Sequence, residues 1–166
     1  ERLRTAAAEP AVRPLGAPRA ALARRYVELV RATVPAPALA GLRLVVDAAH
    51  GAATAVAGPL LAGLGAEVEL LFAAPDGANI NAGCGSLHPG RLAERVRSVG
   101  ADAGVALDGD ADRAILVTGS GRVLDGDDAL LIWARALAAA GRLPGSAVVA
   151  TVMSNLGLEV ALAATG

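Results

Sequence analysis

The sequence predicts an α/β fold, a three-layer sandwich with a mostly parallel mixed sheet and one antiparallel hairpin. Short aliphatic runs alternate along the 166 residues with longer segments whose apolar residues recur at helical spacing, which is typical of a sheet covered by helices. The aliphatic runs show little polar alternation, which indicates strands buried on both faces. Hydrophobic residues make up 54% of the chain and aromatic residues only 2%, so the predicted core is aliphatic.

The first half of the chain predicts two helices, two strands and a long loop. We interpret residues 1–16 as a connector, residues 17–34 as a helix ended by Pro35 and Pro37, and residues 42–46 as a buried strand. A small-residue helix then ends near residue 64, and residues 67–72 form a second strand. Residues 73–90 are rich in Gly, Asn and Pro without any period, and loops this long are usually functional or disordered.

The second half predicts a hairpin flanked by helices. Residues 91–99 are expected to be a helix, residues 102–107 and 114–118 strands, and "GSGR" a turn into a short strand at 123–124. A helix follows at 127–140, with Trp133 and Leu137 in the core. A strand at 147–152 and a helix at 155–164, with Asn155 as its N-cap, complete the predicted elements.

The stretch "VALDGDADRAILV" places three aspartates and an arginine between two predicted buried strands. Asp108, Asp110 and Asp112 are spaced i, i+2, i+4, so a tight loop can turn all three carboxylates to one point. Packed carboxylates repel one another unless a cation lies among them, and oxygen-only ligands favour Mg²⁺. With Arg113 and Mg²⁺ the formal charge is about zero. Because Mg²⁺ keeps positions for phosphate oxygens, the pattern favours a phosphate-handling site.

Other interpretations of this motif are weaker. A solvated acidic turn is the plain alternative. An EF-hand is excluded, because its sixth position would be Arg113 and its twelfth Gly119, where Gly and Glu are needed. A phosphatase with an aspartyl nucleophile also has D-x-D after a strand, but it usually continues with Thr where this chain has Asp112.

The remaining polar motifs favour structural roles. In the second acidic segment, "LDGDD", Asp127 is expected to be the N-cap of the following helix and Asp125 part of the preceding turn. His50 is expected to lie in a turn. Cys84 and His88 lack the second pair that a structural zinc site needs.

Composition excludes several function classes. The formal net charge is -1, from 15 basic and 16 acidic residues, and there is no basic patch for nucleic acid. Glycines and a proline interrupt the longest run without charged residues, 48–66, so we expect no membrane span. A single cysteine excludes an internal disulfide and favours a reducing compartment, which agrees with a cytoplasmic location.

Five segments together resemble one known family. "LDGDADR" resembles the metal loop of the α-D-phosphohexomutase superfamily, and "LVVDAAHGAA", "PDGANINAGCGSLHP", "LDGDD" and "TVMSNLGLE" fall in the order found in its bacterial phosphoglucosamine mutase branch. The resemblance implies a four-domain enzyme that passes a phosphoryl group from a serine to a phosphorylated hexosamine through a bisphosphate. It implies that Asp108, Asp110 and Asp112 bind Mg²⁺ and that Arg113 is an active-site residue.

The resemblance also implies a division of the chain. Residues 1–37 would be the end of domain one with a connecting helix, residues 38–143 domain two, and residues 144–166 the start of domain three. The chain has no segment like the serine loop T-A-S-H-N-P, and the loops that bind sugar and phosphate in domains three and four are also missing. We therefore expect a piece of a longer enzyme, inactive without its other domains. The alternatives are the same domain of a phosphomannomutase or phosphoglucomutase, and a non-catalytic module that binds Mg²⁺ or phosphate.

Overall fold

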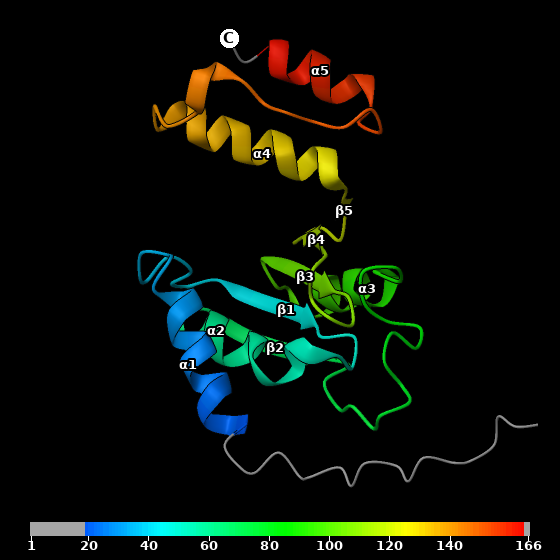
Figure 1. Ribbon diagram of the computed structural model, residues 1–166. Coiled ribbons are helices and arrows are strands. Elements are labelled where there is room, and N and C mark those ends of the chain that lie inside the picture. The colour runs from blue at the N-terminus through cyan, green and yellow to red at the C-terminus, as the bar shows by residue number, and fades with distance from the viewer. Residues whose placement is uncertain (1–18, 165–166) are drawn as a thin grey trace, which may run out of the picture.

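A five-stranded mixed sheet forms the centre of the protein. The computed structural model describes residues 19–164 (Figure 1). The strand order is β2-β1-β3-β4-β5, with β1 parallel to β2 and β3, and β4 antiparallel to β3 and β5. The strands are β1 (Arg43–Asp47), β2 (Glu67–Leu71), β3 (Ala103–Leu107), β4 (Ala114–Thr118) and β5 (Val123–Leu124). The predicted α/β class, the mostly parallel sheet and the antiparallel hairpin are confirmed.

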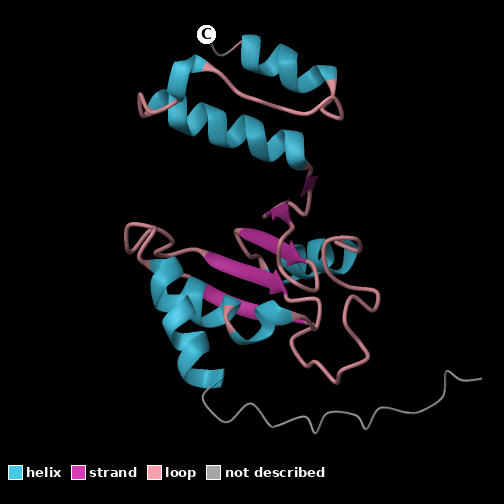
Figure 2. Ribbon diagram, viewed as in Figure 1, coloured by secondary structure: helices cyan, strands magenta, loops and turns pink. Residues whose placement is uncertain are grey.

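Helices cover both faces of this sheet (Figure 2). On one face α3 (Gly90–Val99) packs on β1 and β3, and Val45 contributes to the core beneath it together with Leu92 and Val96. On the other face lie the 3₁₀ turn η1 (Ala52–Ala55) and α2 (Ala57–Gly63), and Val46 packs there. Adjacent strand residues point to opposite faces, which is why Val45 and Val46 belong to different clusters. Helix α1 (Arg19–Arg31) packs on α2 and completes the layers.

Two helices lie apart from the sheet. Helix α4 (Gly126–Ala139) follows β5 and packs on α5 (Leu156–Ala163), with the 3₁₀ turn η2 (Pro144–Ser146) between them (Figure 1). The prediction of a core position for Trp133 is wrong, because its side chain is 67% exposed, while Leu137 is half-buried. The helical spacing was real, but the described part of the chain places no second surface over this side of α4.

Two element predictions need correction, and one lies outside the described residues. No strand forms at 147–152, where Val149 and Val152 are almost fully exposed; a strand needs a hydrogen-bonded neighbour, and the described sheet ends at β5. The single helix expected before residue 64 is the turn η1 followed by α2. The expected connector 1–16 lies outside the described residues, as do the first two residues of the predicted helix 17–34.

The N-cap of α4 is Asp125, not Asp127. Asp125 has an extended backbone, and its side chain accepts the N–H of Asp128 at 2.9 Å, while Asp128 accepts the N–H of Asp125 at 3.3 Å. This reciprocal pair is a capping box. Asp127 instead accepts the N–H of Asn155 at 2.7 Å, and Asn155 caps α5 as predicted.

Candidate metal centre

The loop at residues 108–113 turns the chain from β3 into the antiparallel strand β4. Ala111 donates its N–H to the carbonyl of Asp108 at 3.0 Å, and Asp108 donates its N–H to the carbonyl of Arg113 at 3.3 Å. Ala111 has a positive φ of 61°, which is uncommon for a residue other than Gly. The loop therefore closes tightly at the carboxyl end of a strand, where α/β sheets usually bind ligands.

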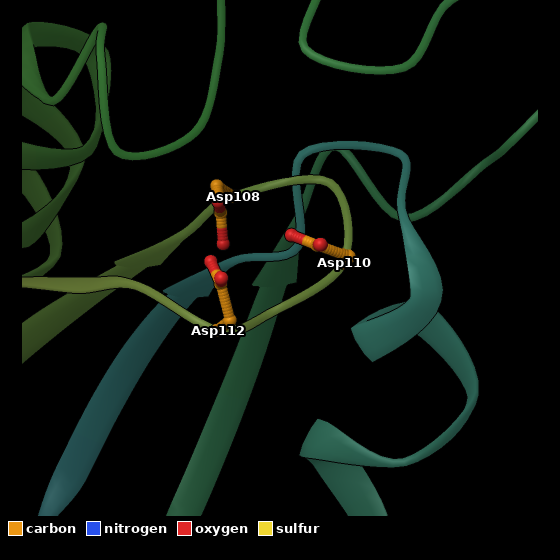
Figure 3. A group of neighbouring side chains, drawn as sticks. All are labelled: Asp108, Asp110 and Asp112. Carbon is orange, nitrogen blue, oxygen red and sulfur yellow. The ribbon is translucent and has the colours of Figure 1, made fainter.

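The three aspartates of this loop point toward one another. Figure 3 shows their carboxylates directed to the inside of the turn. One oxygen each from Asp108, Asp110 and Asp112 lies within 4.8 Å of the others; Asp108 is buried and the other two are exposed. Opposite ligands of an octahedral Mg²⁺ are about 4.2 Å apart, since each bond is about 2.1 Å. The cluster therefore has nearly the size of a Mg²⁺ shell and could hold a metal ion.

Arg113 fixes one of the three carboxylates. Its backbone N–H donates to Oδ1 of Asp108 at 3.0 Å, and its Nε donates to Oδ2 at 2.8 Å. The same Nε lies 3.6 Å from Asp112. Arg113 is largely exposed, and among the described residues its two Nη atoms have no hydrogen-bond partner. A carboxylate has about four lone-pair sites, so Asp108 can accept both bonds and still bind a cation.

These contacts shift the pKa values of the loop in opposite directions. The backbone N–H of Arg113, followed by its guanidinium, lowers the pKa of Asp108 to about 2. The pKa of Asp112 is raised, because its carboxyl faces Asp108 and the negative charge of Asp110. The Asp108 carboxylate is thus stabilised by Arg113, while the repulsion between the carboxylates raises the pKa of Asp112.

Two neighbouring segments hold the loop 108–113, called the metal loop below for its candidate role, by its second residue, Gly109. Ala52 donates its N–H to the carbonyl of Gly109 at 2.8 Å, and Gly51 lies directly against the same peptide unit. On the other side, a Cβ at Gly109 would lie within 3 Å of the side chains of Ile80 and Asn81. Gly is needed at position 51, because a methyl group there would meet the backbone of Gly109, whereas a methyl group at position 109 would meet only the ends of two side chains.

Asp47 is a buried polar residue beside this loop that sequence reasoning missed. Its side chain is fully buried at the carboxyl end of β1. Its oxygens accept the N–H groups of Ala49 and Gly85, each at 2.8 Å. The signal in the sequence was a single Asp at the end of an otherwise apolar run, "LVVD".

The other candidates have structural roles in the loops. His50 has a positive φ of 50° and its Nδ1 accepts the N–H of Ala74 at 3.2 Å, so its predicted turn role is confirmed. Cys84 is buried and His88 exposed.

In the described chain, no helix is both long enough and apolar enough to cross a membrane.

Known proteins resemble this chain over most of its length. The family model for domain II of phosphoglucomutase/phosphomannomutase matches residues 24–121, and that for domain III matches residues 125–166. A phosphoglucosamine mutase of Desulforudis audaxviator is 54% identical over 142 residues, which is 86% of this chain and 31% of the relative. A phosphoglucosamine mutase of Caulobacter vibrioides is 56% identical over 136 residues, or 81% of this chain and 30% of the relative. The chain therefore spans less than a third of either protein.

Solved structures show the same arrangement. A crystal structure of a phosphoglucomutase/phosphomannomutase family protein from Burkholderia thailandensis has a TM-score of 0.62 and 32% identity, and covers 72% of this chain and 26% of that one. A structure from Thermus thermophilus, with a TM-score of 0.59 and 22% identity, shares the fold and covers 73% of this chain and 29% of that one. Because the domain II model alone matches residues 24–121, more than half of the sequence, the chain belongs to the phosphoglucomutase/phosphomannomutase family.

Proposed function

We propose that the chain is the metal-binding part of a phosphoglucosamine mutase, which interconverts glucosamine 6-phosphate and glucosamine 1-phosphate through a phosphoserine and a bisphosphate intermediate. The observation that carries this proposal is the convergence of three carboxylates in a chain 54% and 56% identical to phosphoglucosamine mutases. The serine would belong to a domain outside this sequence, since no T-A-S-H-N-P-like segment occurs in it.

In this proposal Asp108, Asp110 and Asp112 hold Mg²⁺. The ion would offset negative charge on the phosphoryl group during transfer. Arg113 has two roles of its own. Its Nε keeps Asp108 anionic and oriented, at 2.8 Å, and its Nη atoms can donate to a phosphate oxygen at the exposed side of the loop. Phosphoryl transfer depends mainly on such positioning and charge stabilisation.

The same proposal assigns the segments of the chain to domains. Domain two would hold the sheet and the metal loop, and we place its end near residue 125 rather than at residue 143. Two observations support this boundary: the domain III model begins at residue 125, and α4 packs on α5. The remaining domains of the enzyme would then be partners of this chain. A mutase acting on amino-sugar phosphates, precursors of the bacterial cell wall, would work in the cytoplasm.

The test is an assay of the complete protein that contains this sequence. We expect it to interconvert the two glucosamine phosphates in the presence of Mg²⁺, and Asp110→Asn to remove most of that activity. Mannose and glucose phosphates, supplied separately, distinguish a phosphomannomutase or phosphoglucomutase. No turnover of any hexose phosphate by the complete protein would leave the non-catalytic module as the function. The 166-residue chain alone is expected to be inactive, and turnover by it would contradict the proposal.

A further inference from the structure

Asp47 is a buried charge without a cation beside it. Its side chain has no exposed surface, and in the described structure no Arg, Lys or His lies within ion-pair distance of it. Burying an ionised carboxylate costs several kcal/mol unless hydrogen bonds compensate for the lost water. Two backbone N–H groups, from Ala49 and Gly85, supply that compensation at 2.8 Å each. These two bonds join the turn after β1 to Gly85 of the long loop.

The position of Asp47 in the sheet places it next to the metal loop. β1 and β3 are parallel neighbours, and Asp47 is paired with Ala106 of β3. Two residues beyond Ala106, at the same edge of the sheet, the chain reaches Asp108. Asp47 therefore lies at the same edge of the sheet as the cluster, and in the described structure its hydrogen bonds go to backbone N–H groups and not to the three carboxylates.

The two segments that Asp47 holds are those that flank the metal loop. The first begins at Ala49 and continues to Gly51 and Ala52, which contact Gly109. The second contains Gly85 and begins at residues 80–81, which pack on Gly109 from the other side.

Further backbone bonds join these segments to each other and to β3. Asn81 donates its N–H to the carbonyl of Ala49 at 2.9 Å, and Ser86 donates its N–H to the carbonyl of Leu107 at 3.0 Å. Gly85 approaches so closely that a Cβ would lie 2.7 Å from the Leu107 oxygen. The residue that precedes Asp108 is thus fixed by the same segment that Asp47 anchors.

We infer that Asp47 is a positioning residue for the metal site, acting through the segments 49–52 and 80–86 to set the geometry of the three carboxylates. The inference rests on the proposed function, because it assumes that the cluster binds a metal ion. Aspartate suits this place chemically. Its two oxygens accept two N–H groups, whereas asparagine of nearly equal size would accept one and present its NH₂ to the other.

The test compares Asp47→Asn with wild type in the 166-residue chain, using Mn²⁺ titrated by electron paramagnetic resonance as the probe. Removing a group that orients metal ligands typically weakens metal affinity about 10–100-fold, and we expect at least the lower value here. The matched control is Asp102→Asn. Asp102 accepts the N–H of Arg43 at 2.7 Å, so it also joins β1 to β3, but at the opposite end of the sheet. We expect its Mn²⁺ affinity to equal that of wild type.

A second measurement reports on the segments without any metal. Hydrogen exchange followed by mass spectrometry should show the peptide covering residues 80–88 exchanging about 10-fold faster in Asp47→Asn and at the wild-type rate in Asp102→Asn, because an amide exchanges when its hydrogen bond opens. A folded Asp47→Asn with wild-type Mn²⁺ affinity overturns the inference and leaves the proposed function standing. A wild-type chain that binds no Mn²⁺ contradicts the proposed function. Wild-type exchange in Asp47→Asn would then overturn the inference as well, whereas faster exchange would show that Asp47 holds the two segments in place.

If Asp47→Asn fails to fold, Asn81→Gly decides the question. Glycine tolerates the positive φ of 58° at this exposed position and keeps the backbone bond to Ala49, but it removes the side chain that packs on Gly109. Weaker Mn²⁺ binding by this folded variant supports the inference. Unchanged binding overturns it, because the segment held by Asp47 would then have no influence on the metal loop.

Discussion

Substituting Gly51 with Ala should displace the metal loop, although Gly51 itself lies outside residues 108–113. Gly51 has φ -106° and ψ -159°, an extended conformation open to any residue, so the effect is purely steric. The new Cβ would lie 2.8 Å from both Cα and the carbonyl carbon of Gly109, where ordinary contacts begin at 3.4 Å. Both atoms belong to the backbone, so the two loops must separate by about 0.6 Å or more, since a carbon contact at this distance is strongly repulsive.

The expected cost of Gly51→Ala follows from that displacement. Overpacking of a closely packed region destabilises by about 1–3 kcal/mol. The separation also weakens the 2.8 Å hydrogen bond from Ala52 to Gly109. Because metal ligands need placement within about half an ångström, we also expect Mn²⁺ affinity to fall by about 10-fold, the lower end for lost support of metal ligands.

Urea unfolding and a Mn²⁺ titration measure these two effects, with Gly90→Ala as the control. Gly90 is the first residue of α3, and a Cβ there meets nothing within 4 Å. The control should be neutral or stabilised by up to about 1 kcal/mol, because Ala restricts the unfolded chain. If Gly51→Ala matches Gly90→Ala in both free energy of unfolding and Mn²⁺ affinity, the reasoning from close approach is refuted.

Three further predictions concern the acidic residues. Asp110→Asn should weaken Mn²⁺ binding at least about 10-fold, yet leave the melting temperature of the metal-free chain unchanged or higher because it removes repulsion; a clearly lower melting temperature would contradict this. The pKa of Asp108 is lowered to about 2 from 3.8, so its stabilising contribution is complete above pH 4 and is lost as pH falls through 2. In the metal-free chain, the free energy of unfolding of Asp108→Asn should not show this loss between about pH 4 and pH 2. An acid-unfolding curve equal to that of wild type would contradict the stabilising contacts between Asp108 and Arg113. Asp128→Ala should destabilise by about 1 kcal/mol, because it removes the side chain that accepts the N–H of Asp125 in the capping box, more than Arg122→Gln, which loses only an exposed ion pair; equal losses in urea unfolding would assign the effect to the ion pair.

The elements of the sheet were predictable because their signals are local. Aliphatic runs identified all five strands, and "GSGR" identified the hairpin between β4 and β5. The prediction of a strand at 147–152 was wrong, because the composition of a segment does not reveal whether a neighbouring strand exists to pair with it. The prediction of a core position for Trp133 was wrong for a related reason. Helical spacing identifies the apolar face of a helix, but it does not show whether another element covers that face.

The site was predictable in part. The i, i+2, i+4 spacing predicted that the three carboxylates would turn to one point, which a short loop determines by itself. The support of that loop comes from residues much earlier in the sequence, around Asn81 and Gly51. These contacts form only when parallel strands bring their carboxyl ends together in the folded chain. A local sequence pattern therefore does not predict them.

The second acidic segment shows what the first one lacks. In "LDGDD", Asp125 and Asp128 accept backbone N–H groups at the start of α4, and Asp128 also pairs with Arg122 at 2.6 Å. Asp127 accepts the N–H of Asn155. Every carboxylate of this segment has a donor from the protein, and the positive end of the helix dipole favours their charge. It therefore needs no cation, although its letters nearly repeat those of the metal loop.

In the metal loop the protein's own donors do not suffice. Arg113 satisfies Asp108 with two hydrogen bonds, but Asp110 accepts no hydrogen bond from the described residues, and the pKa of Asp112 is raised by its carboxylate neighbours. Three carboxylates and one guanidinium leave a formal charge of about -2, held close together by backbone contacts that cannot neutralise it. A divalent cation has both the charge and the preference for oxygen ligands that this cluster requires. The difference between the two segments thus lies in which donors surround the aspartates, and that difference is the physical argument for metal at one and a helix cap at the other.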